Sequence, residues 1–142
     1  MTPTIRIAET DPEIQACHPV MAQLRPHLEA AEFVPLVRRL QDGTGFRLAY
    51  VHDDGVKAVA GFRVSDWLAG GRYLEIEDLV TAAGERSRGY GGALFDWLVQ
   101  QAGECDCDHV RLVSSVTRTD AHRFYERRGM ERLAHYFHLT LR

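Results

Sequence analysis

A glycine-rich turn between an apolar strand and a helix is the feature of this chain best suited to do chemistry. Gly89, Gly91 and Gly92 follow an apolar stretch and open a helical pattern. Glycine lets the backbone approach a ligand closely, and the first N–H groups of a helix have no partner within it. Those donors and the positive end of the helix dipole favour a phosphate group. We therefore predict an anion site, with Arg86 and Arg88 at its mouth to hold phosphate oxygens.

Two familiar phosphate-binding loops do not fit this turn. A Walker loop needs Gly-Lys-Ser or Gly-Lys-Thr to reach the outer phosphates, and Lys57 is the only lysine in the sequence. A dinucleotide fingerprint needs a third glycine three places after the second, where this chain has Leu94. The turn also lies past the middle of the chain rather than in an opening βαβ unit. Both interpretations are therefore set aside.

The six residues from Arg86 to Gly91 match a different pattern, Gln/Arg-x-x-Gly-x-Gly/Ala. This stretch resembles the coenzyme A pyrophosphate loop of the GCN5-related N-acetyltransferase (GNAT) family. The resemblance implies acetyl-CoA as a co-substrate and no metal ion. The loop residues that it assigns to the cofactor are Arg86, Ser87, Arg88, Gly89, Tyr90, Gly91 and Gly92.

A second stretch, residues 118–130, predicts a short helix with Thr119 or Asp120 as N-cap and Gly129 as its stop. It resembles the second GNAT signature, Asn-x-x-Ala-x-x-Phe-Tyr-x-x-x-Gly-Phe. Arg118 replaces the usual Asn and Met130 the usual Phe, and the methionine keeps the volume of the side chain. The match makes Arg118 a candidate contact to the cofactor. Three residues share one face of the helix: Ala121, Phe124 and Tyr125.

Length and composition predict one globular domain over residues 1–142. The chain is 45% hydrophobic and 26% charged, which is ordinary for a soluble protein. It contains no apolar run near the roughly 20 residues of a membrane span, and its start does not look like a signal peptide. We therefore expect a cytoplasmic protein with no membrane partner. The net charge of −3 and the lack of a basic cluster make nucleic acid an unfavourable partner.

The three cysteines, Cys17, Cys105 and Cys107, show neither an even count nor Cys-x-x-Cys spacing. A disulfide framework and a zinc ribbon are therefore not indicated. Asp108 and His109 follow the last cysteine, but successive residues on an extended chain point to opposite sides. A solvated turn explains this cluster better than a metal site.

Hydrophobic periodicity predicts an alternation of helices and strands. Thr10 caps a first helix that has Pro12 in its first turn, and a second helix follows the break at Pro26 and ends near Gly45. The turn 53–55 joins a hairpin. The predicted strands are Ile5–Ala8, Phe46–His52, Val56–Val64, Arg72–Thr81 and Val110–Ser114, with a closing strand or hairpin over Glu131–Arg142, and a helix over Gly89–Ala102 follows the phosphate loop.

Carried onto this order, the GNAT resemblance implies an α/β (α+β) fold with a twisted, mostly antiparallel sheet and helices on both faces. The fourth and fifth strands, Leu74–Thr81 and Val110–Ser114, would run parallel and splay apart around the cofactor. Splayed strands leave backbone groups unpaired, so the amide-rich pantetheine arm can complete the ladder. The backbone residues that the resemblance assigns to this arm are Leu79, Val80 and Thr81.

Acetyl transfer needs a neutral amine, and an amine with a pKa of about 10.4 is almost fully protonated at pH 7. A general base relieves that penalty. Strand alternation puts Glu75 and Glu77 on the face opposite Leu74, Ile76 and Val80. Glu77 is our first candidate for the base, through water. Asp78 is the second, because a bulge would reverse the alternation there.

Two further groups would act on the thioester. A backbone N–H near Val80 could stabilise the oxyanion that develops on the carbonyl. Tyr125 matches the tyrosine of the family signature, and a phenol with a pKa of about 10 is protonated at neutral pH, so it can donate to the leaving thiolate. Packing beside Phe124 is the alternative role for this tyrosine.

The sequence thus predicts an N-acetyltransferase in which acetyl-CoA and a primary amine bind together and the amine attacks directly. The acceptor would be a small molecule or a peptide, held by residues 20–45 and the C-terminal strands, and a homodimer is compatible with the resemblance. Two alternatives stay open. One is a non-catalytic acyl-CoA-binding regulatory module, and the other is a toxin-like acetyltransferase of aminoacyl-tRNA, which the acidic balance disfavours. Release of free thiol from the thioester separates an enzyme from a binder.

Overall fold

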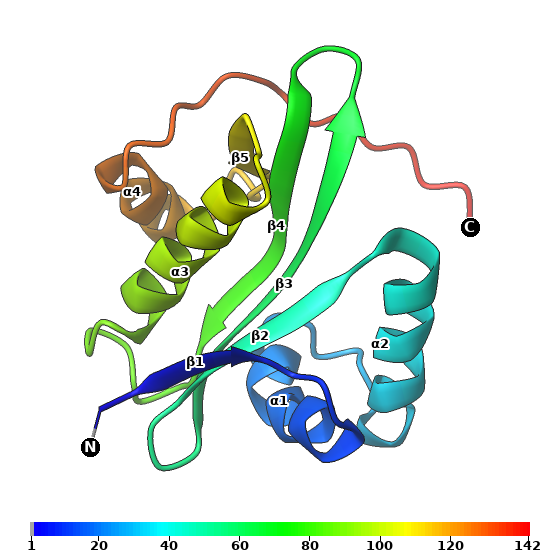
Figure 1. Cartoon of the computed structure of the whole chain (residues 1–142), viewed down its shortest axis with the longest axis vertical. Coiled ribbons are helices and arrows are strands. Elements are labelled where there is room, and N and C mark those ends of the chain that lie inside the picture. Colours follow the sequence, from blue (N-terminus) through cyan, green and yellow to red (C-terminus); the bar gives the residue numbers. More distant parts are fainter. Residues whose placement is uncertain (1) are drawn as a thin grey trace. The chain divides into compact units, whose positions relative to one another are not determined.

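The computed structural model describes residues 2–142. Within that range the chain divides into two compact units, the first ending at Arg111 and the second running from Leu112 to Arg142. The single domain expected over residues 1–142 stays a prediction. The elements labelled in Figure 1 are β1 (Thr4–Ile7), α1 (Asp11–Leu24), α2 (Ala30–Thr44), β2 (Arg47–His52), β3 (Val56–Trp67), β4 (Gly71–Thr81), α3 (Tyr90–Glu104), β5 (His109–Leu112) and α4 (Thr119–Arg127).

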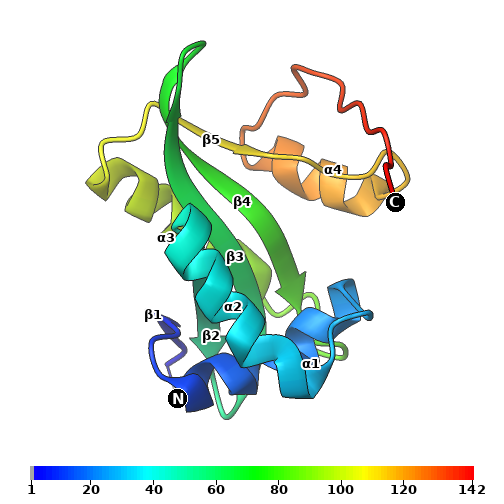
Figure 2. The same cartoon turned by 90° about the vertical axis from the view of Figure 1, so that its right-hand side faces the viewer.

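The strands form one mixed sheet in the order β1-β2-β3-β4-β5. The pairs β1–β2, β2–β3 and β3–β4 are antiparallel. β4 and β5 are neighbours joined through α3, and they run parallel, as a crossover connection requires. In Figures 1 and 2, α3 covers one face of the sheet while α1 and α2 cover the other. The α/β architecture expected from the sequence is confirmed.

Local signals set the ends of the first two helices. The Thr10 hydroxyl accepts a hydrogen bond from the backbone N–H of Glu13, and the Glu13 carboxylate accepts one from the backbone N–H of Thr10, so a capping box opens α1. α2 ends at Thr44 because Gly45 takes the left-handed conformation, with φ of 73°. The cap at Thr10 and the helix end near Gly45 were predicted from sequence, whereas the capping box and the left-handed conformation are seen in the structure.

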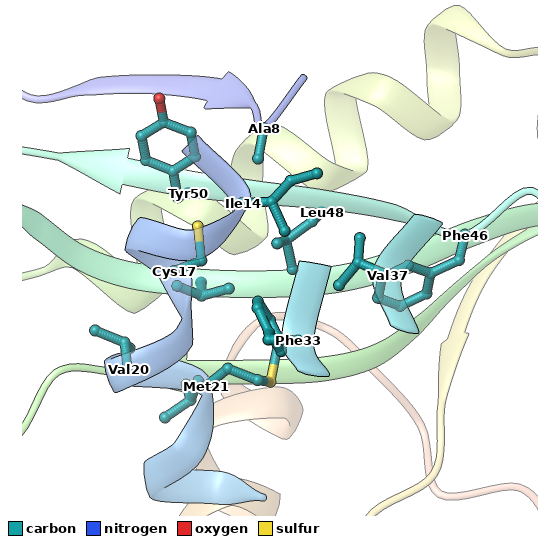
Figure 3. Close-up of a cluster of buried hydrophobic side chains, with 12 residues drawn as sticks. Ala8, Ile14, Cys17, Val20, Met21, Phe33, Val37, Phe46, Leu48 and Tyr50 are labelled. Atoms are coloured by element: carbon teal, nitrogen blue, oxygen red, sulfur yellow. The ribbon is translucent and has the colours of Figure 1, made fainter. Parts of the chain in front are cut away.

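The main core lies between the sheet and the helices α1 and α2. Figure 3 shows side chains of α1, including Cys17 and Met21, and of α2, including Phe33, gathered over the sheet together with Leu48 of β2. Ile14, Cys17 and Leu48 are fully buried. The apolar residues of α1 and α2 recur at helical intervals, as the sequence indicated, so each helix presents one apolar stripe to the sheet.

Two predictions near the C-terminus are wrong. The N-cap of α4 is Arg118 rather than Thr119 or Asp120, and its side chain makes no capping hydrogen bond within the described chain. The segment Glu131–Arg142 forms no strand or hairpin, although it is locally extended, as Tyr136, His138 and Thr140 contact one another in alternation. Alternation alone favours an extended backbone, but a strand also needs a partner to complete its ladder.

Candidate active site

The predicted anion loop connects β4 to α3 and leaves the start of the helix uncapped. Gly89 is the N-cap with φ of 86°, and no side chain among residues 2–142 caps this helix end. The first helical bond runs from the N–H of Ala93 to the carbonyl of Gly89. The earlier N–H groups of α3 therefore remain as donors for an anion. Ser87 and Gly84 also have positive φ, 72° and 83°, so the loop turns sharply before the helix begins.

Gly89 and Gly91 are needed for different reasons. At Gly89 the space around the backbone is open, but the positive φ strains any residue with a Cβ. Gly91 is helical, and a Cβ there would lie 3.0 Å from Thr81 Oγ1. The end of β4 and the first turn of α3 are thus in close approach at Gly91.

The charged groups of the loop are partly neutralised by Glu85. One of its carboxylate oxygens lies 3.3 Å from Lys57 Nζ and the other 3.3 Å from Arg88 Nε. Arg86 is exposed. The hydroxyl of Tyr90 donates to Asp53 at 2.6 Å, which raises the pKa of the phenol and holds its ring at the β2–β3 turn. Tyr90 can therefore offer an anion its backbone N–H but not its side chain.

A β-bulge in β4 sets the directions of the candidate bases. Gly61 of β3 pairs with Asp78, whereas the next residue, Phe62, pairs with Ile76, so Glu77 is the extra residue in the ladder. In such a bulge two successive side chains on the bulged strand oppose one residue of the partner strand. The reversal of alternation that the sequence raised for Asp78 is confirmed.

The two sides of the bulge lie on opposite faces of the sheet. Phe62 packs edge-on against Trp97 of α3, with ring centroids 6.1 Å apart, and its partner Ile76 shares that face. A Cβ on Gly61 would lie 2.6 Å from Asp78 Oδ2 and 2.6 Å from the ring of Phe46, so Asp78 faces α1 and α2. The absence of a side chain at Gly61 therefore makes room for the carboxylate.

The bulge also corrects one prediction. Val80 was expected on the face of Leu74 and Ile76, but it packs in the core cluster formed with α1 and α2. Val80 thus shares the face of Asp78, because alternation restarts after the extra residue. Simple alternation holds up to Ile76 and fails beyond it.

Each candidate base carries an arginine partner. Arg63 Nε lies 2.7 Å from Glu77 Oε1, and Arg25 Nε lies 2.8 Å from Asp78 Oδ1. Arg25 also donates to the backbone carbonyl of Glu77 at 3.2 Å. The carboxylate of Asp78 is 15% exposed and that of Glu77 36%. Each arginine engages one oxygen, so the second oxygen of each carboxylate is available to a bound amine.

Glu75, the third acidic residue of β4, is held in a buried ion pair. It is buried and lies 2.5 Å from Arg111 Nε. The guanidinium of Arg111 also lies 3.9 Å from the ring centre of Tyr73 and 4.3 Å from that of Trp67. An arginine held by both a carboxylate and aromatic faces is well ordered. Glu75 is therefore committed to Arg111.

A cavity of about 180 Å³ opens beside the two candidate bases. Its walls come from the end of α1, the α1–α2 connection, α2 and β2, and its polar end from β4. Figure 3 shows several of its apolar walls, including Phe33, Val37 and Phe46. The lining residues are Met21, Arg25, His27, Leu28, Phe33, Leu36, Val37, Leu40, Phe46, Leu48, Glu77 and Asp78.

Tyr125 lies on α4, in the second unit. Its ring packs edge-on against Phe124, with centroids 5.5 Å apart, and the residue is half-buried. Burial raises the pKa of its phenol, and the nearby cation of Arg118 acts weakly in the opposite direction. The hydroxyl therefore stays protonated throughout the neutral range, as a proton donor requires.

Sequence reasoning missed Arg25, Arg63 and Gly61. None of them belongs to a motif, and each acts on β4 through tertiary contact. The sequence does predict the hairpin turn at residues 53–55, which pairs β3 with β2. That pairing gives no information on which residues of β3 lie against β4.

Neither a metal centre nor a membrane span is found in the described chain. Among residues 2–142, no three His, Cys, Asp or Glu side chains gather closely enough to hold a metal ion. No helix in the same range is long and apolar enough to cross a membrane.

Comparison with known proteins identifies this arrangement. Residues 9–130 match the model of the acetyltransferase (GNAT) family. The chain is 31% identical over 109 residues to an uncharacterized N-acetyltransferase, YhdJ, of Bacillus subtilis strain 168, a match that covers 76% of this chain and 77% of the relative. Its fold resembles glucosamine-6-phosphate N-acetyltransferase of Arabidopsis thaliana, with a TM-score of 0.80 and 19% identity over the full length of both chains.

A further solved structure, AAC(6')-Iy in complex with a bisubstrate analogue of CoA and acetylneamine, has a TM-score of 0.84 and 14% identity, covering 100% of this chain and 99% of that one. The sheet and helices have the arrangement of these acetyltransferase structures. The chain belongs to the GNAT family, and it is an acetyltransferase that transfers an acyl group from acyl-CoA.

Proposed function

We propose that this protein transfers the acetyl group of acetyl-CoA to a primary amine by direct attack in a ternary complex. The observation that carries the proposal is the construction of β4. Near its C-terminal end, β4 carries the carboxylates of Glu77 and Asp78. The strand then ends at Thr81, and the loop after it leads to the uncapped start of α3. At about 3.3 Å per residue, Asp78 and Thr81 are about 10 Å apart along the strand.

The cofactor would lie along this stretch. The N–H groups at the start of α3, from Tyr90 to Gly92, would bind the pyrophosphate, with Arg86, Ser87 and Arg88 around it. The backbone of Leu79, Val80 and Thr81 would pair with the pantetheine arm. Support comes from the uncapped helix start and from the absence of side chains at Gly89 and Gly91, the first of which lies in open space. Arg118, at the N-terminus of α4, is a further candidate contact.

Glu77 or Asp78 would take the proton from the incoming amine. Each carboxylate is held in place by one arginine, Glu77 by Arg63 and Asp78 by Arg25. Glu77 is the more exposed of the two, so it can act through water, whereas Asp78 lies deeper beside the cavity. The backbone N–H of Val80 would stabilise the oxyanion, and Tyr125 would protonate the leaving thiolate.

The test is acetyl transfer by the purified full chain. Acetyl-CoA is supplied with a panel of amines, aminoglycosides, amino acids and peptides, and free thiol release is followed together with the mass of the acetylated product. We expect thiol release that depends on one class of amine and is matched by acetylated product. If acetyl-CoA binds but no acceptor in the panel is acetylated, the proposal gives way to a regulatory acyl-CoA-binding module.

A further inference from the structure

The cavity beside Glu77 and Asp78 has a chemical character that the proposed function leaves unspecified. Of its twelve lining residues, eight are apolar: Met21, Leu28, Phe33, Leu36, Val37, Leu40, Phe46 and Leu48. The four polar ones, Arg25, His27, Glu77 and Asp78, stand at the end formed by β4 and the α1–α2 connection. The cavity is therefore apolar along its length and charged at one end.

The charged end favours an ammonium or amine group. Arg25 and Arg63 each occupy one carboxylate oxygen, Oδ1 of Asp78 and Oε1 of Glu77. Within residues 2–142, no hydrogen-bond donor contacts Oδ2 of Asp78 or Oε2 of Glu77. These two oxygens can accept hydrogen bonds from a nitrogen that has at least two N–H groups, which a primary amine provides.

The apolar walls favour a single hydrophobic group on that amine. A dry apolar cavity of about 150 Å³ is enough to hold benzene, so a cavity of about 180 Å³ suits one aromatic ring or a branched aliphatic group. A polyhydroxylated sugar would leave its hydroxyl groups without partners against Val37, Phe46 and Leu48, and burying an unpaired hydroxyl is unfavourable.

We propose that this cavity binds the acceptor, and that the acceptor is a small primary amine carrying one aromatic or branched aliphatic group. This inference rests on the proposed acetyl transfer and names its substrate class. The amine nitrogen lies at the Glu77–Asp78 end, and the hydrophobic group extends between α2 and β2.

The proposed reaction balances without any further reactant. The amine lone pair forms a C–N bond with the acetyl carbonyl carbon, and the C–S bond of the thioester breaks. The amine loses one proton to Glu77 or Asp78, and the thiolate gains one from Tyr125. The products are an N-substituted acetamide and free coenzyme A, and solvent returns the proton to the phenol.

The first experiment compares acceptors at equal concentration with the wild-type chain. The probes are 2-phenylethylamine and isopentylamine as hydrophobic amines, and glucosamine 6-phosphate and neamine as polar ones. We expect kcat/KM for 2-phenylethylamine to exceed that for either polar amine by about tenfold or more, the discrimination that a hydrophobic pocket exerts over roughly one methylene group. Faster acetylation of a polar amine overturns the acceptor proposal and leaves the proposed acetyl transfer standing.

Two variants locate the binding site. Leu36→Trp places an indole on the cavity wall, and we expect KM for 2-phenylethylamine to rise by about tenfold with the affinity for acetyl-CoA unchanged. Val34→Trp is the matched control, because Val34 is also half-buried on α2 but does not line the cavity. Leu40→Ala enlarges the cavity, so it should improve kcat/KM for tryptamine relative to 2-phenylethylamine. Equal effects of Leu36→Trp and Val34→Trp, with no shift in Leu40→Ala, overturn the proposal.

Direct binding separates failure of the pocket from failure of the reaction. Calorimetry with 2-phenylethylamine, in the presence of coenzyme A, measures occupancy of the cavity without turnover. Binding that Leu36→Trp weakens and Val34→Trp does not, in the absence of any acetylated product, supports the pocket and overturns the proposed reaction. No binding to a folded wild-type chain overturns the pocket.

Discussion

The β4–α3 loop and the cavity beside β4 are built in different ways, although one strand serves both. The loop consists of backbone donors and of glycines that admit a ligand, and it lies within about a dozen consecutive residues. The cavity is made from side chains of α1, α2, β2 and β4, and its carboxylates take their directions from one bulge. A site made from backbone suits a cofactor shared across a family, whereas a site made from side chains can differ from one member to the next.

A substitution in the β4–α3 loop, the site made from backbone groups, is expected to give the largest effect. Gly91→Val adds a Cβ that meets Thr81 and blocks the approach of the pyrophosphate to the N–H groups of α3. Losing two hydrogen bonds to a charged group, each worth about 1.5–3 kcal/mol, should weaken acetyl-CoA binding by about 10² to 10⁴. Calorimetry measures the affinity.

Gly103→Val is the matched control for that experiment. Gly103 also lies in α3, but a Cβ there meets nothing within 4 Å. Both substitutions replace a helical glycine by valine and so change helix propensity equally, and circular dichroism should show two folded proteins. If folded Gly91→Val binds acetyl-CoA as tightly as Gly103→Val, the phosphate site is wrongly assigned.

Tyr125→Phe tests whether a side chain donates the proton to the leaving thiolate. The change removes one hydroxyl and keeps the ring against Phe124, so packing should be preserved. A positioned acid contributes about 10² to 10⁴ in rate, and turnover should fall by that factor while acetyl-CoA affinity stays the same. Because the pKa of Tyr125 is raised, wild-type activity should not lose this acid before the pH passes about 10.

Steady-state turnover and direct binding on the same sample decide the role of Tyr125. Tyr136→Phe serves as the control, since that tyrosine lies in the exposed C-terminal segment. Turnover of Tyr125→Phe within about twofold of wild type, with chemistry shown to limit the rate, would assign the tyrosine to packing alone.

Glu77→Gln and Asp78→Asn sharpen the distinction between the two carboxylates. Glu77 can act through water and Asp78 lies close by, so losing either one should lower the rate by about 10-fold to 10²-fold, less than the full value of a general base. The loss should be greatest at low pH, where the acceptor is most protonated. The measurement is the pH profile of kcat/KM.

The mutant whose pH profile changes shape identifies the base. Asp66→Asn is a control that removes an exposed carboxylate, paired with Arg72, from the neighbouring strand. An unchanged profile in Glu77→Gln together with a flattened one in Asp78→Asn would transfer the role to Asp78.

Glu13→Gln should give the smallest effect, on stability rather than on activity. Hydrogen bonds from Tyr50 and from Thr10 lower the pKa of Glu13 from 4.5 to about 2. A carboxyl whose pKa is lower in the folded state stabilises the fold above its unfolded pKa, and this contribution is lost as the pH falls from about 4.5 towards 2. A glutamine at this position can still accept in the capping box, so the substitution should cost only the difference between a charge-assisted and a neutral hydrogen bond, about 1 kcal/mol at pH 7.

Thermal unfolding across pH checks the role of Glu13. We expect the difference between wild type and Glu13→Gln to shrink below pH 4.5, because wild type loses the same interaction there. Glu9→Gln removes a nearby exposed charge and should show no such convergence. A constant difference at every pH would mean that the charge of Glu13 does not contribute.

Sequence was sufficient wherever a structure depends on neighbours along the chain. The helix cap at Thr10, the helix end at Gly45 and the glycine turn before the helix at Gly89 all formed as predicted, since each requires only local backbone geometry. Strand alternation likewise located Leu74 and Ile76 in the buried part of β4, although Tyr73 and Glu75 between and beside them are buried too.

Tertiary structure decided what depends on pairing between distant segments. The bulge at Glu77 exists because β3 and β4 share a register that no local signal fixes, and it turned Val80 and Asp78 towards α1 and α2. Arg25 reaches β4 only when α1 packs on the sheet, and Arg63 only when β3 pairs with β4. The strand or hairpin predicted over residues 131–142 did not form for the same reason. A strand needs a partner strand as well as suitable residues of its own.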